Sequence, residues 1–576
     1  MKKHFFTPAF ILYSIILPMT GLEFYCLFFK ILLSRAFEKG VNFYFVNGLF
    51  YISAGLILAF VSLLIIQKDA AKQLVHQFRS NYSIQRFEKK DLLLILLPMT
   101  PIIQYIFSNI DSMTVKDAAV ILGGFILLSG VIIYILPMFC GRADSKRILM
   151  LMGLAFIFTI NSMALISDSF SWYLRGSFLI QFFIFLFVLI IAMVFYDVKF
   201  KFFLSALISC LFVFNSAVII TSSMTEEKTS EDMFYQNAAL QYAQVRKPAI
   251  KPNIYLLIYD AYASMETINA YGIDNQPQYD FLEQNGFVFY QGVYSVGATS
   301  LDSMARVLNI SMEFYGNNRR AVSGDGIVQK ILKENGYETY GLFAIDYFFV
   351  SIDSSYYHSY PEQESSAYKK IIPAILIGEF RFDFSFTEQK HIEFVKFKQG
   401  VFANEPVNRF IYMHTNLPSH SQNSGVCLVN EVDQYAQRLK RTNLEMQQDI
   451  EIILKNDPSA ILIIAGDHSP YLTKNCTGTG GKYPLSQINR LDIQDRYGTF
   501  LAIRWPDGSY QGYDKITVLQ DIFPVVFAYI YKDEGFLNLK ISPITQESQI
   551  VSGATVHNGI IIGGINDGEP LFISNN

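Results

Sequence analysis

The chain has 576 residues, of which 51% are hydrophobic and 15% are aromatic. Its mean hydropathy of +0.26 is high for a water-soluble protein and indicates contact with lipid rather than an oversized core. The formal net charge is only -4, and no Lys/Arg-rich block stands outside the short loops between apolar segments, so we expect no nucleic-acid partner.

Residues 1–223 predict a polytopic α-helical membrane domain. A helix needs about 20 mostly apolar residues to cross the hydrocarbon core, because its backbone polar groups must bond within the segment. Pro98 and Pro101 interrupt the third candidate, which is short, and no small-residue cleavage site follows the first, so we expect a retained anchor. We predict about seven spans, at residues 8–32, 43–66, 91–107, 118–139, 148–166, 176–196 and 202–222.

The charges of the short loops predict the orientation of these spans. With the N-terminus inside, thirteen basic residues face the cytoplasm, namely Lys2, Lys3, Lys68, Lys72, Arg79, Arg86, Lys89, Lys90, Arg142, Lys146, Arg147, Lys199 and Lys201. Four face the outside, namely Arg35, Lys39, Lys116 and Arg175. This bias follows the positive-inside rule, and an odd number of spans then places everything after about residue 223 outside the cytoplasm.

After the membrane segments, a polar linker is predicted over residues 224–252 and an α/β domain over residues 253–576. Three short apolar runs, at residues 252–260, 409–414 and 460–468, are typical of buried parallel strands, and each ends in an acidic residue or a histidine. Apolar residues at helical spacing separate the second run from the third. Strands that alternate with helices indicate a mostly parallel sheet, whose ligands bind beyond the carboxyl ends of the strands.

Asp260, His414, Asp467 and His468 would all reach that edge of the sheet. A lone Asp after a strand is most often a turn residue or a helix cap, and a lone His is usually a satisfied polar residue. Carboxylate and imidazole groups that converge from separate strands are what a divalent cation requires and a core does not. The combination therefore predicts a metal site.

Residues 295–309 supply the candidate nucleophile. A Gly- and Ser/Thr-rich turn runs into an apolar helical pattern, and a hydroxyl in the first turn of a helix is ordinarily a cap. The same position directs backbone N–H groups and the positive end of the helix dipole at an anion, and a bound cation would lower the pKa of the hydroxyl. Thr299 or Ser300 is thus placed to attack a phosphate ester.

From Pro252 to about residue 545, the chain resembles the sulfatase branch of the alkaline phosphatase superfamily, in particular membrane-anchored transferases such as lipoteichoic acid synthase and the phosphoethanolamine transferases. The order and spacing of the motifs carry this resemblance. The matching pieces are Pro252-Asn253 before the strand that ends in Asp260, Thr299-Ser300 with Ser303, the segment from Met413-His414 to Ser419-His420, and Gly466-Asp467-His468.

The resemblance implies an α/β sulfatase-like fold, one or two divalent metal ions, zinc or manganese, and a hydroxyl nucleophile that forms a covalent phospho-enzyme. Relatives keep a Ser three positions after the nucleophile, and Ser303 lies three positions after Ser300 but four after Thr299. Ser300 is therefore the favoured nucleophile, and Thr299 is the alternative. Arylsulfatases carry a Cys or Ser followed by Pro and Arg at fixed spacing, which the turn lacks, so sulfate-ester hydrolysis is not expected. The implied metal ligands are Asp260, Ser300, Asp467 and His468.

The same resemblance implies that His414 and His420 bind the substrate phosphate or protonate the leaving group. Cys427 lies seven residues after His420 and Cys476 eight after His468, and the predicted compartment is oxidising, so we expect these two cysteines to form a disulfide beside the site.

The predicted function is transfer of a phospho-headgroup, phosphoethanolamine or phosphoglycerol, from a phospholipid donor to an envelope glycan or lipid acceptor. The predicted location is the bacterial cytoplasmic membrane. A phosphodiesterase or phosphatase of the same superfamily stays open as an alternative, because it shares the covalent half-reaction. A non-catalytic transporter or scaffold is a third reading, but the predicted spans carry few charges and show no internal repeat.

Overall fold

The computed structural model describes residues 98–108, 113–138, 143–170, 178–196, 231–345, 348, 357–361, 368–369, 371–372, 388–404, 408–421, 429–474, 483–545 and 554–573. The chain forms two compact units. The first comprises Met1–Ile110, Val115–Ser222 and Tyr368–Arg381, and the second comprises Asp111–Thr114, Ser223–Ala367 and Phe382–Asn576.

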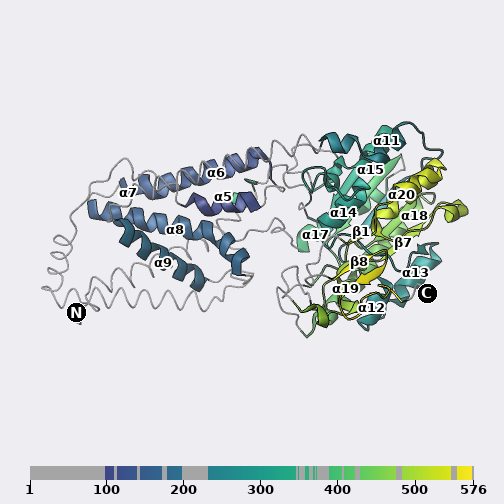
Figure 1. Ribbon diagram of the computed structural model, residues 1–576. Coiled ribbons are helices and arrows are strands. Elements are labelled where there is room, and N and C mark those ends of the chain that lie inside the picture. The colour runs from purple at the N-terminus through teal and green to yellow at the C-terminus, as the bar shows by residue number, and fades with distance from the viewer. Residues whose placement is uncertain are drawn as a thin grey trace. The chain divides into compact units, whose positions relative to one another are not determined.

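The described part of the first unit is helical (Figure 1). Its elements are α5 (Met99–Ser108), α6 (Val115–Ser129), η4 (Gly130–Ile135), α7 (Leu136–Met138), α8 (Ala143–Phe170) and α9 (Phe178–Tyr196). They coincide with the later half of the third predicted span and with the fourth, fifth and sixth. Helix α5 begins directly after Pro98 and carries Pro101 in its first turn, where proline removes no intrahelical hydrogen bond.

Among the described residues, one continuous helix, Val115–Ile135, is long and apolar enough to cross a membrane. Shorter apolar stretches occupy Arg147–Asn161 and Ile184–Met193. The first, second and seventh predicted spans lie outside the described residues, so the polytopic arrangement stays a prediction.

The first unit also includes a short stretch of chain that follows β4 (His358–Tyr360) of the second unit. The backbone N–H of Tyr368 donates to Asp117 Oδ1 on α6 at 3.1 Å, and Ile371 is buried. This stretch belongs to unit one although more than a hundred residues of unit two precede it. Nothing in the sequence pattern indicated this return.

The described residues of the second unit form a seven-stranded sheet with the order β2-β7-β6-β1-β5-β3-β4. The strands are β1 (Ile254–Tyr259), β2 (Val288–Phe289), β3 (Glu338–Phe343), β4 (His358–Tyr360), β5 (Arg409–Thr415), β6 (Ile461–Ala465) and β7 (Leu501–Arg504). Strands β4, β3, β5, β1 and β6 are parallel neighbours, whereas β7 runs antiparallel to both β6 and β2. The mostly parallel α/β sheet expected from the sequence is therefore confirmed.

Helices cover both faces of this sheet (Figure 1). Alternate residues of β1 enter two separate cores: Ile254, Leu256 and Ile258 face one, and Tyr255, Leu257 and Tyr259 face the other. The first core is completed by α11 (Ala238–Gln244), α14 (Ser300–Asn309), α15 (Ile327–Glu334) and α20 (Ile522–Tyr531). The second is completed by α12 (Met265–Ala270), α13 (Gln276–Gln284), α17 (Glu388–Phe402) and α18 (Glu431–Asn456).

The predicted linker contains a structured helix. Asn237 caps α11 by accepting hydrogen bonds from the backbone N–H groups of Ala239 and Leu240, at 2.9 and 3.2 Å. Leu240 and Ala243 are buried in the first core. The end of the segment assigned to the linker thus packs as part of the second unit, because its small apolar face finds partners on α15.

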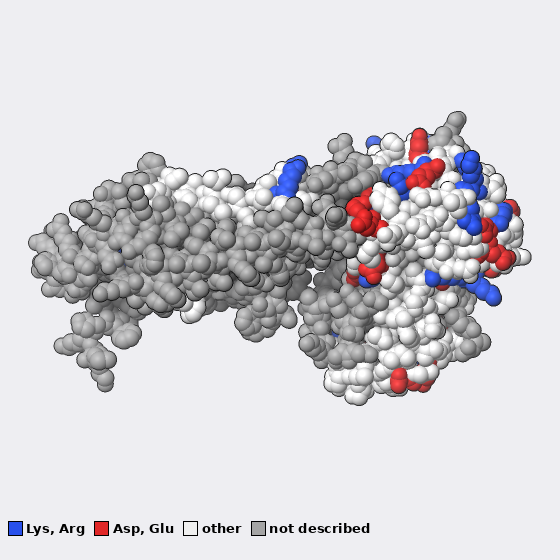
Figure 2. Space-filling model, turned by 45° about the horizontal axis from the view of Figure 1, so that its top comes forward, with Lys and Arg blue, Asp and Glu red and all other residues white. Residues whose placement is uncertain are grey.

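Of the remaining elements, η5 lies between α14 and α15, and the others follow β6 in the chain. Helix α19 packs with a small antiparallel hairpin in a third apolar cluster. The elements are η5 (Ala321–Asp325), η7 (Leu485–Gln487), α19 (Arg490–Tyr497), η8 (Gly508–Gly512), η9 (Leu519–Asp521), η10 (Glu534–Leu539), β8 (Thr555–His557) and β9 (Ile560–Ile562). On the face of this unit seen in Figure 2, basic and acidic side chains are interspersed.

Candidate metal centre and nucleophile

The sheet brings the predicted motifs to one edge. Ile258 of β1 is in register with His414 of β5 and with Ala465 of β6, so the residues after each strand emerge together. Gly466 follows β6 where the chain passes close to the β1 loop, and a Cβ there would lie 2.2 Å from the carbonyl oxygen of Tyr262. Only glycine permits this approach.

Asp260, Asp467 and His468 form a buried group whose ligand atoms all lie within 4.8 Å of one another. Asp467 Oδ1 accepts hydrogen bonds from the backbone N–H groups of Ala261 and His468, at 2.9 and 3.0 Å, which fixes the carboxylate. Asp467 Oδ2 and Asp260 Oδ1 are buried and accept no hydrogen bond from the described residues. Two buried carboxylate oxygens in this condition are what a bound cation would satisfy.

The imidazole of His468 completes the set. Its Nδ1 must donate to the carbonyl oxygen of Ser469, at 2.8 Å, because a carbonyl can only accept. Its Nε2 then faces the carboxylates, 3.4 Å from Asp467 Oδ2 and 3.6 Å from Asp260 Oδ1. An orienting bond on the second ring nitrogen is typical of a metal-ligating histidine. The residues present therefore fit a divalent cation.

The two carboxyl groups have opposite pKa shifts. Burial, followed by the negative charge of Asp467, raises the pKa of Asp260 to about 6. Burial also acts to raise the pKa of Asp467, but the neighbouring imidazoles of His468 and His414 outweigh it and hold that pKa below its usual range. Two carboxylates in one buried space cannot both ionise without cationic partners, so the site favours positive charge between them.

The structure separates the two candidate nucleophiles. Ser300 is the first residue of α14, and its Oγ lies 3.4 Å from His468 Nε2. Thr299 is the N-cap: its Oγ1 accepts from the backbone N–H of Asp302 at 3.3 Å and donates to Asp302 Oδ2 at 3.0 Å. The Thr299 hydroxyl is thus engaged in capping, whereas the Ser300 hydroxyl faces the candidate metal ligands.

The turn before α14 is packed tightly. Ser295 and Ser303 share a buried hydrogen bond of 2.6 Å between their hydroxyls, which joins the turn to the helix. Gly297 lies against the first turn of α14, and a Cβ there would be 2.6 Å from both the carbonyl carbon of Asp302 and the backbone nitrogen of Ser303. Ser303, noted in the sequence as a spacing marker, is therefore a structural partner of the turn.

His414 lies beside the centre but is enclosed by protein. Its Nδ1 is 2.9 Å from the Tyr412 hydroxyl, its Nε2 is 3.5 Å from Asp467 Oδ2, and its ring packs on Phe348 with centroids 4.7 Å apart. Because both ring nitrogens face protein groups, this geometry suits support of the Asp467 carboxylate. Its expected contact with substrate phosphate stays a prediction.

His420 lies on a loop that returns to the same edge. Its Nδ1 donates to the carbonyl oxygen of Ser421 at 2.9 Å, and its ring centroid is 6.2 Å from that of His468. Arg438 of α18 donates from Nε to the Pro418 carbonyl at 2.7 Å and from Nη2 to the His420 carbonyl at 3.3 Å. The backbone N–H of Ser419 donates to the Asp260 carbonyl oxygen at 2.9 Å.

Sequence reasoning missed Tyr412, Arg438 and the backbone role of Ser419. Ser419 stood inside a quoted motif, but Tyr412 and Arg438 read as ordinary strand and helix residues, and no sequence signal marked them. Cys427 and Cys476 lie outside the described residues, so the expected disulfide stays a prediction.

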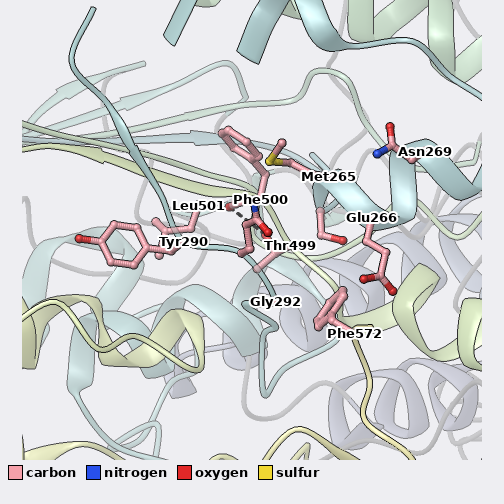
Figure 3. Close-up of a pocket in the computed structure, with 11 residues that line it drawn as sticks. Met265, Glu266, Asn269, Tyr290, Gly292, Thr499, Phe500, Leu501 and Phe572 are labelled. Carbon is pink, nitrogen blue, oxygen red and sulfur yellow. Dashed lines mark hydrogen bonds between the residues drawn. The ribbon is translucent and has the colours of Figure 1, made fainter. Parts of the chain in front are cut away.

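A separate cavity of about 230 Å³ opens beside the start of β7 (Figure 3). Met265, Phe500 and Phe572 contribute to its wall, and the Glu266 carboxylate accepts hydrogen bonds from Gln494 Nε2 and the backbone N–H of Ile573. None of its lining residues belongs to the Asp-Asp-His group. This cavity is therefore distinct from the candidate metal centre.

No family model and no curated protein matches the chain by sequence. Among solved structures, the chain is similar to the C-terminal periplasmic domain of EcEptC from Escherichia coli, with 13% identity over 50% of this chain and 84% of that chain and a TM-score of 0.33. It is also similar to the integral membrane protein lipooligosaccharide phosphoethanolamine transferase A (EptA) from Neisseria meningitidis, with 10% identity over 78% of this chain and 97% of that chain and a TM-score of 0.33.

A third similar structure is the lipoteichoic acid synthase LtaP from Listeria monocytogenes, with 13% identity over 58% of this chain and 89% of that chain and a TM-score of 0.34. At these identities and TM-scores the likeness is distant, so the chemistry of the site rests on its own geometry.

Proposed function

We propose that this chain is a membrane-anchored, metal-dependent enzyme that transfers phosphoethanolamine or phosphoglycerol from a phospholipid to an envelope glycan or lipid. The observation that carries the proposal is the position of the Ser300 hydroxyl, 3.4 Å from His468 Nε2 and beside two buried carboxylate oxygens that accept no hydrogen bond from the described residues. A hydroxyl at a helix N-terminus, next to a cation site, is suited to attack on a phosphodiester.

In the first half-reaction, Ser300 Oγ forms a bond to phosphorus as the bond from phosphorus to the diacylglycerol oxygen breaks. The hydroxyl proton of Ser300 leaves to solvent, and the diacylglycerol oxygen takes a proton from protonated His420 as it departs. His420 is assigned this role because its ring centroid lies 6.2 Å from that of His468, and the hydrogen bond from its Nδ1 to the Ser421 carbonyl orients the ring. The product is a phosphoserine that still carries the headgroup.

In the second half-reaction, an acceptor hydroxyl attacks the phosphoserine, and neutral His420 takes its proton. The bond between phosphorus and Ser300 Oγ breaks, and Ser300 regains a proton from solvent. The positive end of the α14 dipole favours the charge on the phosphoryl group in both steps. Water in place of the acceptor would give a phosphodiesterase, so the acceptor decides between the two activities.

Asp260, Asp467, His468 and Ser300 would hold the metal, for which zinc and manganese are the candidates. When bound, such an ion lowers the pKa of the Ser300 hydroxyl and neutralises phosphate charge. The oxygen and nitrogen ligand set suits either metal.

The test compares Ser300→Ala with Thr299→Ala in the full-length, detergent-solubilised protein incubated with phosphatidylethanolamine and phosphatidylglycerol. Intact mass spectrometry measures the covalent adduct, whose mass names the headgroup. Ser300→Ala should form no adduct while still binding metal, because two carboxylates and an imidazole stay in place. Thr299→Ala should keep the adduct and lose about 1 kcal/mol of stability, because it removes only a helix cap.

Either of two outcomes would contradict this assignment: an adduct on Ser300→Ala, or loss of the adduct in Thr299→Ala without loss of structure. Repeating the incubation with and without a glycan acceptor then separates transfer from hydrolysis.

A further inference from the structure

Tyr471 belongs to none of the predicted motifs, yet its side chain contacts several parts of the candidate centre. It lies three residues after His468, and its side chain is only 4% exposed. Its ring stacks on the His468 imidazole with centroids 4.9 Å apart and planes 7° apart. The ring also stacks on His420, with centroids 5.5 Å and planes 28° apart.

The hydroxyl of Tyr471 contacts the opposite wall of the centre. It donates a buried hydrogen bond to the carbonyl oxygen of Ala298. Ala298 immediately precedes the cap Thr299 and the candidate nucleophile Ser300. A single side chain therefore touches the metal-ligating imidazole with its ring and the nucleophile turn with its hydroxyl, and these two elements are brought together from positions far apart in the sequence.

The surrounding residues hold Tyr471 in an uncommon backbone conformation. Its φ of 58° lies in the left-handed region, which an aromatic residue adopts only when its surroundings impose it. The guanidinium carbon of Arg496 lies 4.2 Å from the ring centroid. The next two backbone N–H groups, of Leu472 and Thr473, donate to the buried carboxylate of Asp495 at 2.8 and 3.0 Å.

We propose that Tyr471 is a positioning residue that sets the plane of the His468 imidazole with its ring and the location of Ser300 with its hydroxyl. The ring function concerns the protein's own affinity for a divalent cation. The hydroxyl function rests on the proposed function, because it concerns the distance between Ser300 Oγ and the ligands. Groups that orient metal ligands typically change affinity or activity by about 10- to 100-fold when removed.

Three variants of the full-length protein separate the two functions. Tyr471→Phe removes the hydroxyl and keeps the ring, and Tyr471→Leu removes both. Tyr337→Phe is the matched control, since the Tyr337 hydroxyl donates to the Pro252 carbonyl at 2.9 Å, at the opposite end of β1. Zn²⁺ affinity is measured by isothermal titration calorimetry, the rate of the lipid adduct by mass spectrometry, and folding of the metal-free protein by thermal unfolding.

Tyr471→Phe should bind Zn²⁺ within about twofold of wild type and form the adduct about 10- to 100-fold more slowly. Tyr471→Leu should bind Zn²⁺ about 10- to 100-fold more weakly. Tyr337→Phe should match wild type in both measurements. The Zn²⁺ affinity of Tyr471→Phe should therefore exceed that of Tyr471→Leu. A purely structural role of the phenol would not produce this difference.

Wild-type Zn²⁺ affinity in a folded Tyr471→Leu protein would overturn the ring function. If Tyr471→Leu does not unfold cooperatively, weakened Zn²⁺ binding by Tyr471→Phe would overturn the ring function instead. A wild-type adduct rate in Tyr471→Phe would overturn the hydroxyl function. If wild type itself forms no adduct, the proposed function fails and takes the hydroxyl function with it, whereas the zinc titrations still decide the ring function.

Discussion

Asp260 is the residue through which pH is expected to act on the candidate metal centre. Burial and the charge of Asp467 raise its pKa to about 6, from an ordinary value near 4. A cation binds the ionised carboxylate, so proton and metal compete for the same oxygen atoms. The affinity for metal should therefore be highest above this pKa and should fall as the pH drops through it.

In numbers, Mn²⁺ affinity measured by calorimetry should fall about tenfold between pH 7 and pH 5, because a carboxyl group with a pKa near 6 passes from mostly ionised to mostly protonated over that range. Asp325→Asn is a suitable control. Burial also raises the pKa of Asp325, but its carboxylate pairs with Arg320 at 2.7 Å and not with a residue of the candidate metal centre. The control should keep the wild-type profile, and an unchanged affinity at pH 5 would count against Asp260 as a ligand.

At the scale of elements, the first turn of α14 decides where the nucleophile stands. Thr299 caps the helix, the Ser295–Ser303 hydrogen bond holds the turn against it, and Gly297 allows the turn to touch the helix backbone. A Cβ at Gly297 would lie 2.6 Å from backbone atoms, so Gly297→Ala must displace either the turn or the helix start. A shift of about 1 Å in the nucleophile is enough to slow a reaction up to about a hundredfold.

Gly297→Ala should therefore slow formation of the lipid adduct on the order of tenfold to a hundredfold, with Zn²⁺ affinity changed far less. Gly400→Ala, in the last turn of α17, provides the comparison, because a Cβ there meets nothing within 4 Å. That change should leave the adduct rate alone and stabilise the protein by up to about 1 kcal/mol. Equal adduct rates in the two variants would mean that the turn does not position Ser300.

At the scale of the whole molecule, the chain combines a helical unit with an α/β unit that carries the candidate chemistry. A phospholipid donor presents its phosphate at the bilayer surface, so an anchored catalytic unit would gain proximity to its substrate. The proposed envelope acceptor would require the second unit to lie outside the cytoplasm, as the loop charges predict.

A β-lactamase fusion after Thr221 should protect cells from ampicillin, because the enzyme protects only when it is exported. A fusion after Lys199, in a loop predicted to face the cytoplasm, should give no protection. Protection by the Lys199 fusion alone would reverse the predicted orientation of the membrane domain.

Much of the second unit could be predicted from local sequence. Short runs of apolar residues predicted β1, β5 and β6 because buried parallel strands expose neither face to water, and the residues at their ends were identified as Asp260, His414, Asp467 and His468. The parallel register then brought three of these into one group. Apolar length likewise indicated helices that coincide with α6, α8 and α9, whereas the full number of spans stays a prediction.

The spacing to Ser303 already favoured Ser300 over Thr299, but only the tertiary structure showed that the Ser300 hydroxyl faces His468 and that Thr299 caps α14. It also showed that Tyr471 stacks on His468, that Arg438 bonds to the loop of His420, and that α11 packs against α15. The contacts of Ser300 with His468, of Tyr471 with Ala298 and of Arg438 with Pro418 join residues that are distant along the chain, and no periodicity or motif encodes such pairs. The sequence by itself thus determined which chemical groups end each strand, since that depends on local burial, while the fold decided which of those groups meet, since that depends on long-range packing.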